Sequence, residues 1–74
     1  MTLGLKIKFK RLEQGKTQAQ LRKEAGVGIG VITSLEKGQI DNLTVKTLKK
    51  VAKALNTTVQ ELFFSDDEEE NKQN

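Results

Sequence analysis

The 74-residue sequence contains no cysteine and no histidine. Disulfide bonds, thiolate or imidazole metal sites and Cys–His or Ser–His catalysis are therefore excluded together. Proline and tyrosine are also absent, and the only aromatic residues are three phenylalanines. We expect a protein that is not an enzyme, binds no metal or cofactor, and folds on side-chain packing alone, with the small core that so short a chain permits.

Long apolar stretches are missing as well. No run approaches the roughly 20 residues that a membrane-spanning helix needs. At the N-terminus, Lys6 and Lys8 interrupt the apolar residues, so the chain does not begin like a signal peptide. We therefore expect a cytoplasmic protein with no membrane partner.

Charge is abundant but unevenly placed. The net charge is +3, yet residues 1–64 carry 12 Lys and Arg against 5 Asp and Glu, a formal charge of +7. Residues 65–74 carry five acidic residues against Lys72, a formal charge of −4. This asymmetry predicts one basic globular domain over residues 1–64 that binds a polyanion, followed by a disordered acidic tail over residues 65–74.

Helix signals appear from the start of the chain. Apolar residues recur at helical spacing at Leu5, Phe9 and Leu12, with Leu3 and Ile7 on a neighbouring stripe. The pattern predicts an amphipathic first helix that ends at Gly15. Thr17 and Gln20 then form a capping box, which predicts a second helix that continues to Ala25.

Three more helices follow. Val31, Ile32 and Leu35 predict a short third helix, which Gly38 stops. Only residues 26–28 are then left to connect the second and third helices, and so short a turn predicts a steep crossing. Thr44 is expected to cap a fourth helix, and a second capping box at residues 58–61 opens a short fifth one. The result is an all-α, compact five-helix bundle whose expected core includes Leu21, Ile32, Leu35, Leu48, Val51 and Leu62.

Two short helices joined by a glycine-centred turn form a helix-turn-helix, whose second helix can enter a DNA major groove about 12 Å wide. Characteristic residues occur in register at Leu3-Gly4, Arg11, Gly15, Thr17-Gln18, Leu21, Ala25-Gly26-Val27, Ile32, Leu35-Glu36, Gly38, Thr44, Thr47-Leu48, Ala52, Ala54-Leu55 and Glu61-Leu62-Phe63. On these residues the chain resembles the Cro/C1-type (XRE) helix-turn-helix family of phage repressors and small bacterial regulators over residues 3–63. The resemblance implies a lambda repressor-like fold and a DNA-binding transcriptional regulator, with double-stranded DNA as its partner and no evident small-molecule ligand.

The resemblance also implies roles for individual positions. Base edges are expected to face Gly28, Ile29, Gly30, Thr33 and Ser34. Phosphate contacts are expected from Gln18, at the start of the second helix, and from the loop formed by Lys37, Gly38 and Gln39. Arg11 and Glu36 match a charged pair that ties the first helix to the third.

The base-facing positions depart from the family pattern. Gly28-Ile29-Gly30 offers no bidentate contact to guanine or adenine, which predicts modest specificity or reliance on DNA shape. Ile29 has two open interpretations: it touches a thymine methyl group, or it extends the core stripe toward Ile32. Arg22 stands where the family has Ala, so its long side chain must leave toward solvent or toward the DNA backbone.

The lysines form a second group of departures. Lys10 and Lys16 stand where the family usually has Leu, and we expect Phe9 and Leu12 to supply the missing apolar surface. Five other lysines are expected to lie on a solvated surface that adds a diffuse positive field: Lys6, Lys8, Lys49, Lys50 and Lys53.

The leading hypothesis is a repressor that binds an inverted repeat as a homodimer. Phe64 is a candidate dimer contact, since one short helix does not easily bury two adjacent aromatic residues; the alternative is that Phe64 folds over its own core. A restriction–modification controller of the same fold is a related possibility. An antitoxin or other protein-binding adaptor is a possibility of a different class.

Overall fold

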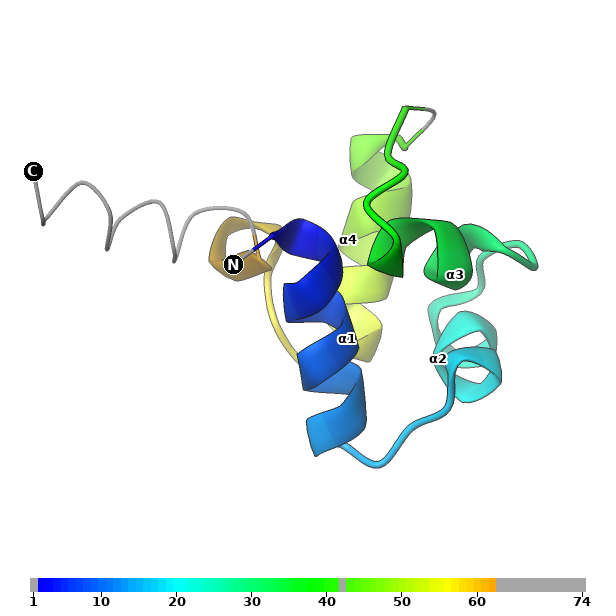
Figure 1. The fold of residues 1–74 in the computed structure, drawn as a ribbon, viewed down its shortest axis with the longest axis vertical. Helices are drawn as coiled ribbons and strands as arrows, with labels where there is room; N and C mark the ends of the chain where they lie inside the picture. The colour runs from blue at the N-terminus through cyan, green and yellow to red at the C-terminus, as the bar shows by residue number, and fades with distance from the viewer. Residues whose placement is uncertain (1, 42, 63–74) are drawn as a thin grey trace, which may run out of the picture.

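The computed structural model describes residues 2–41 and 43–62. Four helices, α1 (Leu3–Glu13), α2 (Gln18–Ala25), α3 (Val31–Glu36) and α4 (Val45–Ala54), are followed by a fifth helical segment at residues 59–62 (Figure 1). No strand occurs in these described residues. The predicted all-α fold is therefore confirmed, whereas Phe64, the acidic segment 65–74 and the predicted boundary between them lie outside the described residues.

Helices α2 and α4 and the segment 59–62 begin at the predicted caps. The Thr17 hydroxyl accepts from the backbone N–H of Gln20 (3.0 Å), and the Gln20 side chain accepts from the backbone N–H of Thr17 (2.8 Å), which completes the capping box of α2. Thr44 caps α4 by accepting from the N–H of Thr47. The Thr58 hydroxyl accepts from the N–H of Glu61 at 3.1 Å and starts the segment 59–62. Each hydroxyl satisfies a donor that the helix itself leaves without a partner.

The connection between α2 and α3 is longer than predicted. It covers residues 26–30, because α3 begins only at Val31. Gly30 precedes the helix with φ +92° and contributes no side-chain cap. The prediction of a connection limited to residues 26–28 was wrong because a glycine in the left-handed region cannot be part of the right-handed helix.

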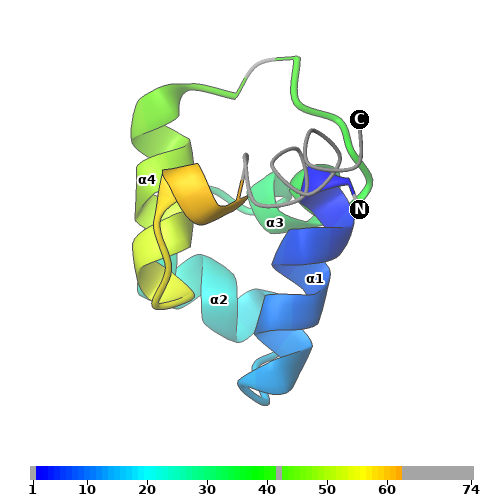
Figure 2. The same ribbon diagram turned by 90° about the vertical axis from the view of Figure 1, so that its left-hand side faces the viewer.

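The core lies between α1, α2, α3, α4 and the segment 59–62. In Figure 2, α1 and α4 stand on opposite sides, while α2, α3 and residues 59–62 fill the space between them. Helix α1 packs on α3, and α2 packs on both α3 and α4. The buried apolar side chains are Ile7, Leu21, Ala25, Ile32, Leu35, Leu48, Val51, Ala52, Leu55 and Leu62, which include all six predicted core residues.

Helix α1 presents a different face to the core than predicted. Ile7 is fully buried, whereas Leu5, Phe9 and Leu12 are 41%, 44% and 52% exposed. The reason is a close backbone contact: a Cβ added to Gly4 would lie 2.7 Å from the carbonyl oxygens of both Leu35 and Glu36. Gly4, Ile7 and Arg11 share one face at helical spacing, and seating that face on α3 turns the Leu5 stripe outward. The expectation that Phe9 and Leu12 supply core surface was therefore wrong.

Polar side chains near α1 close the ends of other helices. The Lys16 ammonium donates to the main-chain oxygen of Ala54 (2.7 Å), and the Gln14 amide donates to that of Leu55 (2.7 Å). Lys6 is 9% exposed and donates to the oxygen of Leu62 at 2.8 Å, so the expectation that it is solvated was wrong. Positive or polar donors suit these sites because the last carbonyls of a helix lack intrahelical partners. The other lysines of that predicted surface are exposed, namely Lys8, Lys49, Lys50 and Lys53.

Candidate nucleic-acid interface

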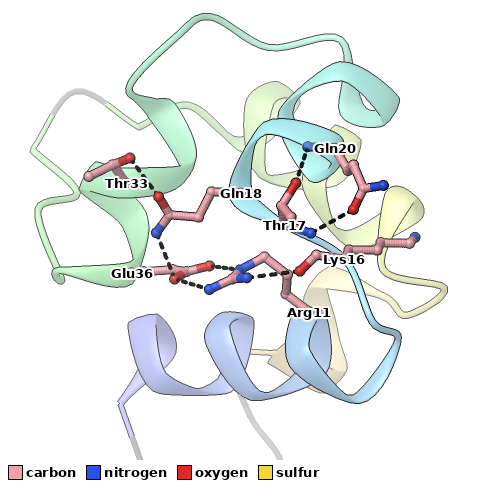
Figure 3. A network of polar contacts seen from close by, with 7 residues as sticks. All are labelled: Arg11, Lys16, Thr17, Gln18, Gln20, Thr33 and Glu36. Carbon is pink, nitrogen blue, oxygen red and sulfur yellow. Dashed lines mark hydrogen bonds and ion pairs between the residues drawn. The ribbon is translucent and has the colours of Figure 1, made fainter.

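A nearly buried ion pair holds α3 against α1. The Arg11 guanidinium donates from Nε to Glu36 Oε2 at 2.7 Å and from Nη2 to Oε1 at 3.0 Å (Figure 3). Its Nη1 donates to the main-chain oxygen of Lys16 at 2.9 Å. The side chains of Arg11 and Glu36 are only 9% and 6% exposed. This bidentate geometry fixes both the distance and the rotation of α3 relative to α1.

The same carboxylate organises the start of α2. Gln18 donates from Nε2 to Glu36 Oε1 at 3.0 Å and accepts from the Thr33 hydroxyl at 3.1 Å. Figure 3 shows the Gln18 amide lying between the two α3 side chains. One cluster thus links α1, α2 and α3, and only its Arg11–Glu36 pair was anticipated. The other contacts could not be anticipated, because Gln18 and Thr33 become neighbours only when α2 and α3 cross.

The hydrogen bonds and charges of this cluster favour the charged forms of both Arg11 and Glu36. Burial raises the pKa of the Glu36 carboxyl, but hydrogen bonds from Arg11 and Gln18 and the positive charges of Arg11 and Lys8 outweigh it, so this pKa lies below its ordinary value of 4.5. The hydrogen bond to Glu36 raises the pKa of Arg11 further. The pair is therefore a permanent structural connection at neutral pH.

The connection between α2 and α3 forms an exposed tip. It projects at the right-hand edge of the molecule in Figure 1. Gly28, Ile29 and Gly30 are all exposed, and the Ile29 side chain is 89% exposed. The interpretation that Ile29 extends the core stripe is therefore excluded. Ile29 lines a groove on each side, one of about 350 Å³ shared with Ser34 and one of about 400 Å³ shared with Arg22.

The remaining predicted contact residues lie on α3 and directly after it. Ser34 is partly buried beside Ile29, while the Thr33 hydroxyl already donates to Gln18. Lys37, Gly38 and Gln39 are exposed directly after α3. Their loop is held by a hydrogen bond from the N–H of Gln39 to the oxygen of Ser34 at 2.9 Å. The structure thus places the predicted base-facing residues on the tip and α3, and the predicted phosphate-facing loop at the opposite end of α3.

Arg22 and Lys16, two residues that depart from the family pattern, both donate to main-chain oxygens. Arg22 lies along the connection, with Nη1 3.4 Å from the oxygen of Val27, and lines one of the grooves beside Ile29. Lys16 donates to the main-chain oxygen of Ala54 and forms an ion pair with Glu24 at 2.7 Å. A lysine at an expected Leu position is a signal that its charge meets an acceptor, but it does not identify Glu24 as that acceptor.

Neither a metal-binding cluster nor a membrane-spanning helix occurs in the described residues, 2–41 and 43–62. No cluster of carboxylates there could hold a metal ion. None of the helices in this part of the chain has the length and apolar character needed to cross a membrane. The surface around α3 presents backbone, hydroxyl, aliphatic and cationic groups.

Comparisons with known proteins agree with this geometry. A family model described as helix-turn-helix matches residues 7–62. Two uncharacterised HTH-type transcriptional regulators of Archaeoglobus fulgidus are 38% and 36% identical over 64 residues, which cover 86% of this chain and 90% and 89% of theirs. The HTH-type transcriptional regulator SinR of Bacillus licheniformis is 32% identical over 68 residues, 92% of this chain but 61% of SinR. A solved SinR–SinI protein complex contains a chain that superposes with a TM-score of 0.79 at 29% identity, covering 97% of this chain and 74% of that one.

Proposed function

Because the chain belongs to the Cro/C1-type helix-turn-helix family of DNA-binding transcriptional regulators, we propose that it is a repressor that binds an inverted-repeat operator as a homodimer. The observation that carries the proposal is the exposed tip at residues 28–30, joined to an α3 that the Arg11–Glu36 pair holds in one orientation. A recognition helix that is already held in one orientation enters a major groove without the entropy loss of being ordered on binding.

The charges support a duplex as the partner. Residues 1–64 carry a formal charge of +7, which attracts the phosphate backbone and raises the rate of association. The exposed loop at the end of α3 is the proposed phosphate contact; it consists of Lys37, Gly38 and Gln39. Gln18 keeps a second amide hydrogen beyond the one given to Glu36, and we assign that hydrogen to a phosphate as well.

Dimerisation sets the spacing of the operator. Two copies related by a twofold axis would place their α3 helices in successive major grooves about 34 Å apart. Phe64 is the proposed contact between the copies. Sedimentation of the wild type and Phe64→Ala at micromolar concentration should shift the variant toward monomer, and equal masses would remove Phe64 from the interface.

DNA binding is tested by selection from random duplexes followed by titration of the enriched sequence at several salt concentrations. A palindromic sequence should be enriched, and the logarithm of affinity should fall with the logarithm of salt at about −0.9 per phosphate contacted. Lys37→Ala should weaken binding and reduce the slope by about 1.8 for the dimer. Lys53→Ala, which changes an exposed lysine in the last turn of α4 that we assign to no phosphate, is the matched control and should leave the slope unchanged.

Repression and its alternatives have separate readouts. Transcription from a promoter that contains the selected operator should fall when the protein is added, and a rise would indicate an activator. A restriction–modification controller would give the same binding data and differ only in the gene regulated. An adaptor that binds protein through the tip would fail to enrich any duplex at low salt, and that result would refute the proposed function.

A further inference from the structure

The tip at residues 28–30 presents one side chain only. Gly28 and Gly30 contribute none, and Ile29 between them is 89% exposed, the highest value of any large apolar residue in the described ranges. Ile29 also lines both grooves described above, one together with Ser34 and one together with Arg22. The side chain that the tip offers to a docking molecule is therefore aliphatic.

The fold does not explain why residue 28 is glycine. Gly30 needs its positive φ, but Gly28 lies outside the positive-φ region. A Cβ at Gly28 would meet a single atom of Val31 at 3.8 Å, an ordinary van der Waals distance. A glycine that neither the turn nor the packing requires is typical of a position where another molecule approaches the backbone closely.

Two polar side chains near the tip already make hydrogen bonds within the protein. The Thr33 hydroxyl donates to Gln18, and the Arg22 guanidinium lies along the connection near the oxygen of Val27. Ser34 remains beside Ile29, but it is partly buried and short. Residues 28–30 themselves carry no side-chain donor or acceptor, so the side-chain contact that the tip offers is apolar.

A DNA major groove presents one apolar feature, the methyl group on C5 of thymine. We propose that Ile29 reads a C5-methyl group on a pyrimidine, so that operator affinity depends on that methyl. The inference rests on the proposed function, in which this tip faces base edges. It goes further in predicting that 5-methylcytosine, which carries the methyl at the same place, is bound more tightly than unmodified cytosine.

The test uses the full chain and the enriched operator. Each thymine is replaced in turn by deoxyuridine, which removes the methyl and keeps the Watson–Crick pair, and affinity is measured by fluorescence anisotropy. Burying one methyl corresponds to about four-fold in affinity, so replacement in both half-sites should cost about 15-fold at one symmetric position. At that position, 5-methylcytosine opposite guanine should bind about four-fold tighter per half-site than cytosine opposite guanine.

Variants assign the effect to Ile29. Ile29→Ala should bind more weakly and lose the preference for methylated duplexes, while Ile29→Val should retain most of it. Leu12→Ala, which shortens an exposed apolar residue on α1, should keep the wild-type preference. Circular dichroism of each variant checks that the helices are intact.

Three results would overturn the proposal. Wild-type affinity that is indifferent to every deoxyuridine shows that no methyl is read, even though DNA binding stands. A methyl preference that survives in Ile29→Ala assigns the effect to DNA shape or to another residue. If the selection enriches no duplex, the proposed function fails, and the methyl contact fails with it.

Discussion

Removing the Arg11 side chain should be among the most damaging single changes outside the apolar core. Arg11→Met deletes three hydrogen bonds, two to Glu36 and one to the Lys16 carbonyl. Glu36, whose side chain is 6% exposed in the wild type, then keeps only Gln18 as a side-chain donor. Stranding a buried charge in this way costs about 3–5 kcal/mol. A chain of this length is expected to have only about 4–11 kcal/mol of stability, so the variant should be close to unfolding.

Urea unfolding at pH 7, followed by far-UV circular dichroism, measures the loss. The absence of tryptophan and tyrosine makes helix content the natural signal. Glu36→Met and the double variant complete a thermodynamic cycle. Because two apolar side chains leave no stranded charge, the double variant should recover much of the loss, with a coupling energy of about 2–3 kcal/mol.

The pH dependence gives an independent check. Since the folded pKa of Glu36 is lowered, its contribution to stability is present above pH 4.5 and is lost as pH falls through that lowered pKa. In Arg11→Met the hydrogen bond and charge of Arg11 are gone, and burial should raise the pKa of Glu36 above its ordinary value. Protonation then relieves the variant while it weakens the wild type, so the stability difference should shrink in acid. A loss below about 1 kcal/mol at pH 7, or a difference that grows in acid, would refute the reasoning.

Two glycine predictions follow from the same structure. Gly4→Ala should lower the free energy of unfolding by about 1–3 kcal/mol, because its Cβ would lie 2.7 Å from two carbonyl oxygens of α3; an unchanged urea midpoint would show that α1 can shift freely. Gly28→Ala should leave thermal stability unchanged but weaken operator binding, whereas Gly30→Ala, at φ +92°, should lower the melting temperature. Of these two positions only residue 30 has a positive φ, so only there should an added Cβ strain the backbone. Equal melting temperatures for the two variants would contradict this expectation.

The candidate site was partly predictable. The Arg11–Glu36 pair and the exposed loop at residues 37–39 followed from the family resemblance. The engagement of Gln18 and Thr33 with each other did not, since their hydrogen bond joins residues 15 positions apart on crossing helices. The exposure of Ile29 also depended on the crossing, because its spacing from Ile32 suits a core stripe as well as a contact residue.

What the sequence determined by itself is the local structure: the capped starts of α2, α4 and the segment 59–62, and the buried faces of α2, α3 and α4. Those signals work within one or two turns of helix, so they need no knowledge of the rest of the fold. Only the tertiary structure decided which face of α1 is buried, because that depends on how closely Gly4 approaches α3. It also decided that Lys6 is buried, because its acceptor is the carbonyl of Leu62, 56 residues further along the chain. Contacts between distant residues leave no periodic trace in the sequence, and in this protein they set both the orientation of α3 and the exposure of the tip.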